Sequence, residues 1–281
     1  RAWLHRAEQG GRLWHRNGVF YRYRAPGYEA IEEAKLREEI YAFLERTLRE
    51  TRAGKVVPFQ PTRTKVDLVI DAVRALTHFA AARSVPCWLD DSALNPTECV
   101  ALQNGILHLP TRRLVKSAPT FFTLNPLAFA YNPKAAPPER WLRFADQLWP
   151  DEPEPIATLQ EYIGYLLTAQ TRYQKILMLV GPKRSGKGTI GRVIRQLLGA
   201  GNVCSPTLST IGGNFGRTGL IGKTAAIIAD ARISGRTDTA AVTECLLSIS
   251  GEDPQSIPRK FLPDWDGTLG VRFVLMTNEL P

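Results

Sequence analysis

The stretch that decides the fold is residues 176–189, which read Ile-Leu-Met-Leu-Val-Gly-Pro-Lys-Arg-Ser-Gly-Lys-Gly-Thr. Its first five residues are all apolar, which predicts a strand buried on both faces of a parallel sheet. A helix is expected next, because apolar side chains recur there at helical spacing and Gly199 is placed to end it. The apolar side chains of that helix are Ile190, Val193, Ile194, Leu197 and Leu198.

The segment between the strand and the helix has the pattern Gly181-x4-Gly186-Lys187 of a P-loop, in the strand–loop–helix context that this motif needs. Glycines let backbone N–H groups approach phosphates, and the helix N-terminus adds its positive dipole end. Lys187 would bring a full charge to the β and γ phosphates, so ATP is the predicted ligand. A chance glycine-rich turn is the alternative. The residues expected to contact the nucleotide are Gly181, Pro182, Lys183, Arg184, Ser185, Gly186, Lys187, Gly188 and Thr189.

A hydroxyl that binds Mg²⁺ normally follows the P-loop lysine directly. Here Gly188 intervenes, and the hydroxyl comes one residue later. We therefore predict Thr189 as the Mg²⁺ ligand from this loop.

Composition limits the classes of protein. The chain has 281 residues, 44% of them hydrophobic, and a net charge of +9. Residues 101–200 carry most of the excess, with 13 Lys and Arg against 6 Asp and Glu. A polyanion such as DNA is a predicted partner, and ordinary solvated basic faces are the alternative. No apolar run is long enough for a membrane span, and the first residues are not a signal peptide. Four scattered cysteines without metal-site spacing are typical of reduced thiols in a cytoplasmic protein: Cys87, Cys99, Cys204 and Cys245.

A cluster of prolines at residues 149–155 is the predicted domain boundary, between residues 1–155 and 156–281. In the first part we expect a hairpin over 12–24 that turns at Asn17-Gly18, and a strand-and-turn stretch from Asn104 to Leu114. Helices are expected over 29–50, 65–83, 139–148 and 156–169.

Beyond the P-loop, a second apolar strand over 225–229 ends at Asp230. Open α/β sheets place ligand-binding residues at the carboxyl ends of their strands, so Asp230 is a predicted Mg²⁺ ligand. A helix over about 238–249 follows, then Gly251-Glu-Asp-Pro254, a Trp265-Asp-Gly turn and a third strand over 271–278 that ends at Asn278.

This order of motifs resembles the superfamily 3 helicases of the AAA+ class, particularly the primase–helicases of phages, plasmids and poxviruses. The resemblance implies a P-loop AAA+ α/β core, with a parallel sheet flanked by helices, preceded by a mainly helical α+β helicase-associated domain. The segments that resemble that preceding domain are Leu13-Trp-His-Arg-Asn-Gly18, Asn104-Gly-Ile-Leu-His-Leu109, Leu127-Ala-Phe-Ala-Tyr-Asn-Pro133 and Leu159-Gln-Glu-Tyr-Ile-Gly-Tyr-Leu-Leu167.

The resemblance also implies roles. Lys187 would neutralise phosphate charge, Thr189 and Asp230 would hold Mg²⁺, and Asn278 would position the attacking water. Arg259, Lys260 and Phe261 match a hairpin that tracks single-stranded DNA inside a hexameric ring. The implied protein is an ATP-dependent DNA helicase motor of phage or plasmid replication, a cytoplasmic homo-hexamer that works with a primase domain or other replication proteins.

Two departures from the family pattern and several alternatives stay open. Ala231 follows Asp230 where a second acid is common, so Asp230 acts alone or with Glu244 or Glu252. The sequence stops at Pro281, before the segment that holds the family's arginine finger, and we expect the polypeptide to continue.

Phe261 is equally explained as a core aromatic, and Asn278 as a strand-end cap. The rival functions are an ATP-binding DNA-binding or assembly protein without helicase activity, and a nucleoside monophosphate kinase. The P-loop of such a kinase normally opens the chain, whereas this one begins only at Gly181.

Overall fold

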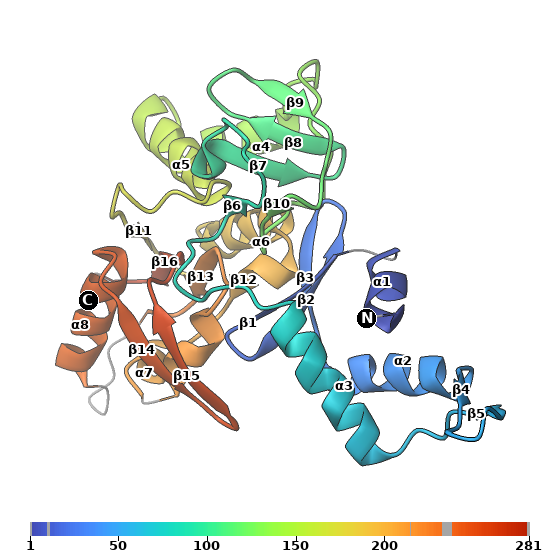
Figure 1. The fold of residues 1–281 in the computed structure, drawn as a ribbon. Coiled ribbons are helices and arrows are strands. Elements are labelled where there is room, and N and C mark those ends of the chain that lie inside the picture. The colour runs from blue at the N-terminus through green and yellow to red at the C-terminus, as the bar shows by residue number, and fades with distance from the viewer. Residues whose placement is uncertain (1, 10–11, 214, 232–237, 280–281) are drawn as a thin grey trace.

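Residues 2–9, 12–213, 215–231 and 238–279 are described by the structure, which is a computed structural model (Figure 1). It contains a four-stranded parallel sheet in the order β11-β16-β13-β12. This confirms the predicted α/β class and the predicted parallel sheet. The strands of the sheet are β11 (Leu177–Val180), β12 (Val203–Cys204), β13 (Ala225–Ile228) and β16 (Arg272–Thr277).

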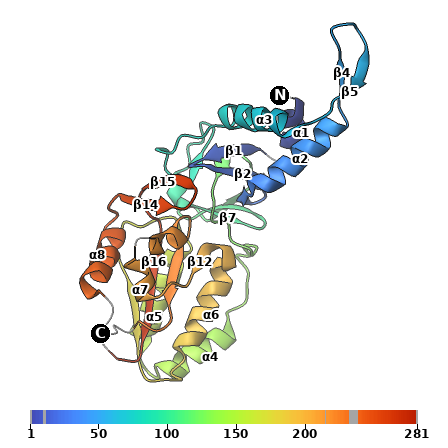
Figure 2. The same ribbon diagram turned by 90° about the horizontal axis from the view of Figure 1, so that it is seen from below.

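Helices cover both faces of this sheet, as Figure 2 shows for α6 and α8. Side chains of β16 point alternately to the two sides, as the period of a strand requires. Val274 and Met276 belong to the core shared with α5 and α6, whereas Phe273 and Leu275 belong to the core shared with α7 and α8. These helices are α5 (Pro153–Leu166), α6 (Lys187–Leu198), α7 (Leu208–Ile211) and α8 (Thr239–Ser250).

The strand and the helix that flank the predicted P-loop are confirmed, but the expected burial of the strand is wrong. Helix α6 ends at Gly199, whose φ of 84° suits a glycine. In β11, Met178 and Val180 are 39% and 45% exposed. Strand β11 is at the edge of the sheet, and only its alternate side chains, such as Leu179, reach the core around α6.

Strand β16 is tied to α5 by a buried arginine. Arg272 is 4% exposed, and its Nη2 donates hydrogen bonds to the carbonyl oxygens of Leu166 and Thr168, each 2.8 Å away. These carbonyls lie at the C-terminus of α5, where a cation also meets the negative end of the helix dipole. Burial lowers the pKa of Arg272 to about 10, which still leaves it charged at neutral pH.

A second core belongs to the first part of the chain and contains Trp3, Leu13 and Phe20. It lies between a three-stranded antiparallel sheet and helices, and the sheet includes the predicted hairpin with its turn at Asn17 and Gly18 (φ 49° and 79°). The elements are α1 (Ala2–Gln9), β1 (Leu13–Arg16), β2 (Val19–Arg24), β3 (Gly27–Ile31), α2 (Glu33–Glu45) and α3 (Arg63–Leu76).

Two predicted helices in this part are shorter than expected. Residues 29–31 belong to β3 instead of a helix, because Ile31 pairs with Phe20 of β2. Helix α3 stops at Leu76 rather than at 83, because the carbonyl of Thr77 accepts a hydrogen bond from the backbone N–H of His15 in β1 (2.7 Å). Both differences come from pairing with a distant strand, which a local pattern does not contain.

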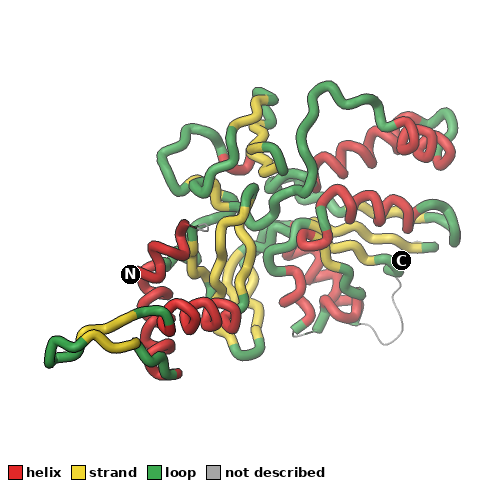
Figure 3. Tube along the Cα trace, turned by 90° about the vertical axis from the view of Figure 1, so that its right-hand side faces the viewer, coloured by secondary structure: helices red, strands yellow, loops and turns green. Residues whose placement is uncertain are grey.

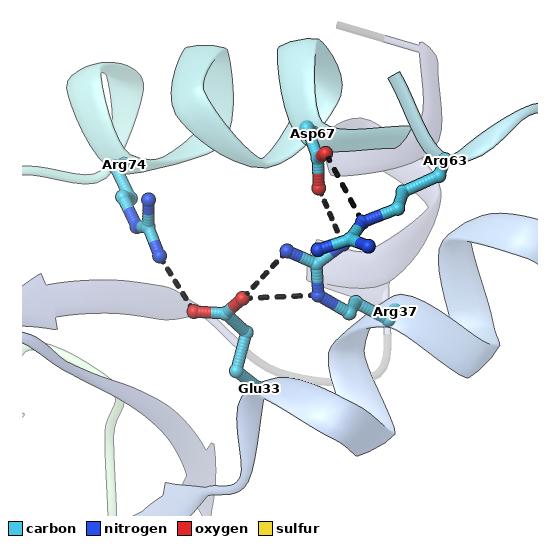
Figure 4. A network of polar contacts seen from close by, with 5 residues as sticks. All are labelled: Glu33, Arg37, Arg63, Asp67 and Arg74. Atoms are coloured by element: carbon cyan, nitrogen blue, oxygen red, sulfur yellow. Dashed lines mark hydrogen bonds and ion pairs between the residues drawn. The ribbon is translucent and has the colours of Figure 1, made fainter. Parts of the chain in front are cut away.

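A network of ion pairs joins α2 to α3 (Figure 4). Glu33 accepts from Arg37 and Arg74, at 2.9 and 2.5 Å, and Arg37 also contacts Asp67 at 2.6 Å. Because these side chains are partly exposed, the contribution of each pair to stability is small, on the order of 1 kcal/mol or less. The network adds to the apolar contacts of α2 and α3, whose side chains Leu36, Ile40, Val66 and Ile70 share one core.

The elements from α1 to α3 form an amino-terminal module. The segment between this module and the parallel sheet consists of short strands and the helix α4. Helix α4 has the predicted bounds, and α5 starts at Pro153, inside the proline cluster, because the first turn of a helix tolerates proline. Val100 and Leu107 share one core with α5 and α6, so side chains from both sides of residue 155 pack together. The remaining elements are β6 (Cys87–Trp88), β7 (Cys99–Leu102), β8 (Gly105–His108), β9 (Arg113–Val115), β10 (Phe121–Phe122), α4 (Glu139–Leu148) and the short 3-10 helices 96–98, 200–202 and 216–220.

Two hairpins complete the fold. One is formed by β4 (Leu48–Glu50) and β5 (Val56–Pro58), and it extends away from the rest of the molecule (Figures 2 and 3). The other is formed by β14 (Gln255–Arg259) and β15 (Leu262–Gly267), ahead of β16. None of the described helices has the length and apolar character that crossing a bilayer requires.

Candidate functional site

The glycine-rich loop follows β11 and leads directly into α6. Gly186 is the residue before the helix, with φ 86°, a conformation that favours glycine. A Cβ placed on Gly186 would lie 2.8 Å from Cδ2 of Leu148 in α4, so a side chain at this position would also collide with that helix. The loop is tied to the sheet by Gly181, whose N–H donates to the carbonyl of Thr277 in β16 (3.3 Å).

The ammonium group of Lys187 lies inside the curl of the loop. Its Nζ donates to the carbonyl oxygens of Gly181 and Pro182, at 2.6 and 2.9 Å, and to Oγ of Ser185 at 3.2 Å. The fourth contact is with Oδ1 of Asn278, at 3.3 Å. The predicted P-loop lysine and the predicted sensor residue, 91 positions apart in sequence, are therefore in contact.

The order of strands explains this contact. Strand β16 lies between β11 and β13, so the residues that follow the three strands reach the same carboxyl edge of the sheet. Asn278 follows β16, and Asp230 comes two residues after β13. The N–H of Ala231 donates to the carbonyl of Met276 (2.8 Å), which keeps the Asp230 segment alongside β16.

Thr189 has a different neighbour from Lys187. Its hydroxyl accepts a hydrogen bond from Nη2 of Arg192, one turn along α6, at 2.9 Å. The hydroxyl that contacts Lys187 is that of Ser185. Lys183 and Arg184 are exposed.

The two acids considered as helpers of Asp230 lie in α8 and just after it. Glu252 accepts a hydrogen bond from Thr171, which precedes β11 and is thus at the opposite end of that strand from the P-loop. Glu244 is an exposed residue in the middle of α8.

The hairpin β14–β15 has Lys260 and Phe261 at its turn. Phe261 has a φ of 61° and is fully exposed at 102%, so the alternative of a core aromatic is wrong. The predicted turn at Trp265-Asp-Gly is also wrong, because Trp265 pairs with Ile257 inside the hairpin. Arg259 stabilises the hairpin from within, since its Nε and Nη2 both donate to the carbonyl of Pro263 (2.9 and 2.7 Å).

Sequence reasoning missed one aromatic residue beside this turn. Nζ of Lys260 lies 5.9 Å from the ring centroid of Phe215, within the range of a cation–π contact. Phe215 is 53% exposed. Lys260 thus has one aromatic ring next to it in the chain and another beside it in space. The only local signal was a large apolar residue in the glycine-rich segment 212–219.

The hairpin β14–β15 also contacts the amino-terminal module. A Cβ on Gly18 would lie 3.3 Å from Cδ2 of Leu262, so the β1–β2 turn and the hairpin touch. Burial raises the pKa of Tyr21 in β2, and the nearby charges of Arg16 and Arg259 partly oppose this. The turn with Lys260 and Phe261 is therefore braced by the amino-terminal sheet.

Comparisons with known proteins bear on the fold. A family model described as a family of unknown function (DUF5906) matches residues 179–281, less than half of the chain. No match was found among curated protein sequences. Solved structures of the NrS-1 C-terminal region, described as apo, superpose on this chain with TM-scores of 0.57, 0.55 and 0.58 at 11, 12 and 11% identity.

Each of these structures matches 99% of this chain, which spans only 56% of their length. The shared feature is the fold, which is that of the NrS-1 C-terminal region over almost all of this chain.

Proposed function

We propose that the chain is an ATP-dependent DNA helicase motor of the superfamily 3 (AAA+) type, from a phage or plasmid replication protein. The observation that carries the proposal is the 3.3 Å contact between Nζ of Lys187 and Oδ1 of Asn278. A lysine in a P-loop and a polar residue at the end of the neighbouring strand are the groups that must meet around a γ phosphate. The likeness in fold to the NrS-1 C-terminal region agrees with this proposal.

The residues present fit a nucleotide with Mg²⁺. The ammonium of Lys187 is held by three oxygen atoms of its own loop, which are the contacts that phosphate oxygens would replace. The loop packs closely against α4 because Gly186 has no side chain. Thr189 and Asp230 would hold the Mg²⁺, an oxygen-seeking ion that neutralises the charge developing on the phosphates.

Asn278 would orient the attacking water from the end of β16, and Asp230, which comes two residues after β13 at the same edge of the sheet, would activate it. Phosphoryl transfer depends mainly on positioning and charge stabilisation, so a small set of well-placed groups is sufficient.

The DNA-binding part of the proposal is the turn of β14–β15. Lys260 supplies charge for a phosphate, and the exposed rings of Phe261 and Phe215 supply surfaces for base stacking. In the proposed protein, residues 156–281 form the motor, residues 1–155 its associated domain, and copies assemble into a hexameric ring around single-stranded DNA, together with a primase domain or other replication proteins.

The test is ATP binding to the wild-type chain and to Lys187→Ala, measured by calorimetry. A charge-assisted hydrogen bond contributes about 1.5 to 3 kcal/mol, so loss of a lysine that serves two phosphates should reduce affinity roughly 100-fold or more. Lys175→Ala is the matched control, because that exposed lysine lies at the other end of β11. Unchanged affinity in Lys187→Ala would reject the nucleotide site. ATP binding without hydrolysis or unwinding in the whole protein would favour the assembly protein.

A further inference from the structure

The hairpin β4–β5 carries an unbalanced set of positive charges. Its residues 46–58, which we call the basic arm, contain four cations and a single acid, Glu50. All four cations are exposed, and within the part of the chain that the structure describes none takes part in an ion pair. These cations are Arg46, Arg49, Arg52 and Lys55.

Several arginines elsewhere in the amino-terminal module are held in ion pairs. Arg37 and Arg74 are paired in the network of Figure 4, and Arg22 is paired with Glu39 at 2.6 Å. These three arginines are neutralised within the module, whereas the cations of the basic arm are exposed and, among the described residues, unpaired. Unpaired cations gathered on one projecting element form an attractive surface for a polyanion.

The basic arm is held in a fixed direction at its root. Thr47 donates its hydroxyl to the carbonyl of Phe43 in α2 (2.9 Å), and the N–H of Phe59 donates to the carbonyl of Thr47 (2.8 Å). Nζ of Lys65 lies over the Phe59 ring at 4.9 Å.

At the tip, the backbone of Thr51 and Lys55 is hydrogen-bonded, and Gly54 makes the turn with φ 74°. The charges of the basic arm therefore lie on an ordered hairpin that extends away from the body of the molecule (Figures 2 and 3).

We propose that the basic arm binds the phosphate backbone of double-stranded DNA. The arm has no aromatic residue, so it lacks the stacking group with which proteins hold unpaired bases. A duplex offers phosphates at high density while its bases stay stacked. A second copy of the chain can join the proposed ring through other surfaces, but it does not offer the dense negative charge that the four cations of the arm would bind, because each copy carries a net charge of +9. That the polyanion is DNA rests on the proposed function, but the binding itself does not require ATP.

The test uses the full chain without nucleotide, and fluorescence anisotropy with a short DNA duplex and with each of its separated strands over a series of salt concentrations. The variant replaces Arg49, Arg52 and Lys55 by alanine. For each phosphate that the variant no longer neutralises, the slope of log affinity against log salt should flatten by about 0.9 with the duplex. The matched control replaces Arg112, Arg113 and Lys116 by alanine, which removes the same number of charges from the basic middle region.

The proposal expects a flatter slope and weaker duplex binding in the arm variant only. R49K/R52K, which keeps the charges, should retain the slope and the duplex affinity of the wild type. An arm variant that binds duplex like the wild type would overturn it. So would an equal loss in the control, which would mean that only total charge matters, or a loss confined to the single strands. All of these outcomes are independent of whether Lys187→Ala loses ATP.

Discussion

Asp230 lies at the carboxyl edge of the sheet, next to the strand that Asn278 follows. If it serves the metal, Asp230→Asn should leave Mg²⁺-free nucleotide binding almost unchanged and lower Mg²⁺-dependent hydrolysis by the whole protein roughly 100-fold or more, because the charge that holds the ion is removed. Calorimetry in chelator and a phosphate-release assay measure the two effects. Asp71→Asn, an exposed acid on α3, is the control. Wild-type turnover in Asp230→Asn would contradict the assignment.

At the residue scale, the sequence pointed to the residues of the candidate site but not to all of their contacts. Lys187 and Asn278 were identifiable because each has a local signature, a glycine-rich loop and the end of an apolar strand. Their contact, and the one between Gly186 and Leu148, depend on how distant elements pack. Phe215 was missed because an exposed aromatic in a loop has no periodic neighbour to mark it.

At the scale of elements, the hairpin β14–β15 gives a prediction that separates charge from stacking. Lys260→Ala should weaken single-strand binding for all sequences alike and flatten its salt slope by about 0.7 for each phosphate that is no longer neutralised. Phe215→Ala and Phe261→Ala should lower affinity with little change of slope, since base stacking contributes about 1 to 3 kcal/mol per base. Anisotropy with single strands measures all three.

Lys116→Ala, from the basic middle region, is the control for this hairpin. An unaltered slope in Lys260→Ala, together with a flatter one in Lys116→Ala, would move the single-strand site from the hairpin to the middle region.

Elements with strong periodicity were predictable almost to the residue, as α4 and α6 show. Errors occurred where pairing partners are far apart in the chain. Strand β3 forms because β2 offers it a partner, and Trp265 lies in a strand because Ile257 faces it. The exposed side of β11 follows from its place at the edge of the sheet, and strand order has no signature within a single strand.

For the whole molecule, buried weak acids predict loss of stability at high pH. Burial raises the pKa of Tyr28 to about 12 and that of Cys99 to about 11. In the unfolded chain the pKa values of this tyrosine and this cysteine are near 10 and 9. Above these pH values the unfolded chain releases the two protons while the folded chain retains them. The free energy of unfolding therefore has its full value below about pH 9 and decreases as the pH rises through 11 and 12.

Urea unfolding at increasing pH measures this effect. Above pH 10, Tyr28→Phe should reduce the loss of unfolding free energy by on the order of 1 kcal/mol, because it removes one of the titrations whose pKa burial raises. Tyr173→Phe is the control, since Tyr173 is an exposed tyrosine. A pH dependence that is the same in Tyr28→Phe and in the wild type would show that Tyr28 does not contribute.

The place of β16 in the sheet has a consequence for synthesis on the ribosome. The chain makes β11, β12 and β13 first, but β11 can join the other two only through β16, which emerges about a hundred residues after β11 begins. Until then, the apolar edges of β11 and β13 have no neighbour between them, and such unpaired edges are sites of aggregation. The nascent chain therefore depends on its last described strand to complete this half of the molecule, and a stalled or prematurely released product that lacks it is a natural client for chaperones.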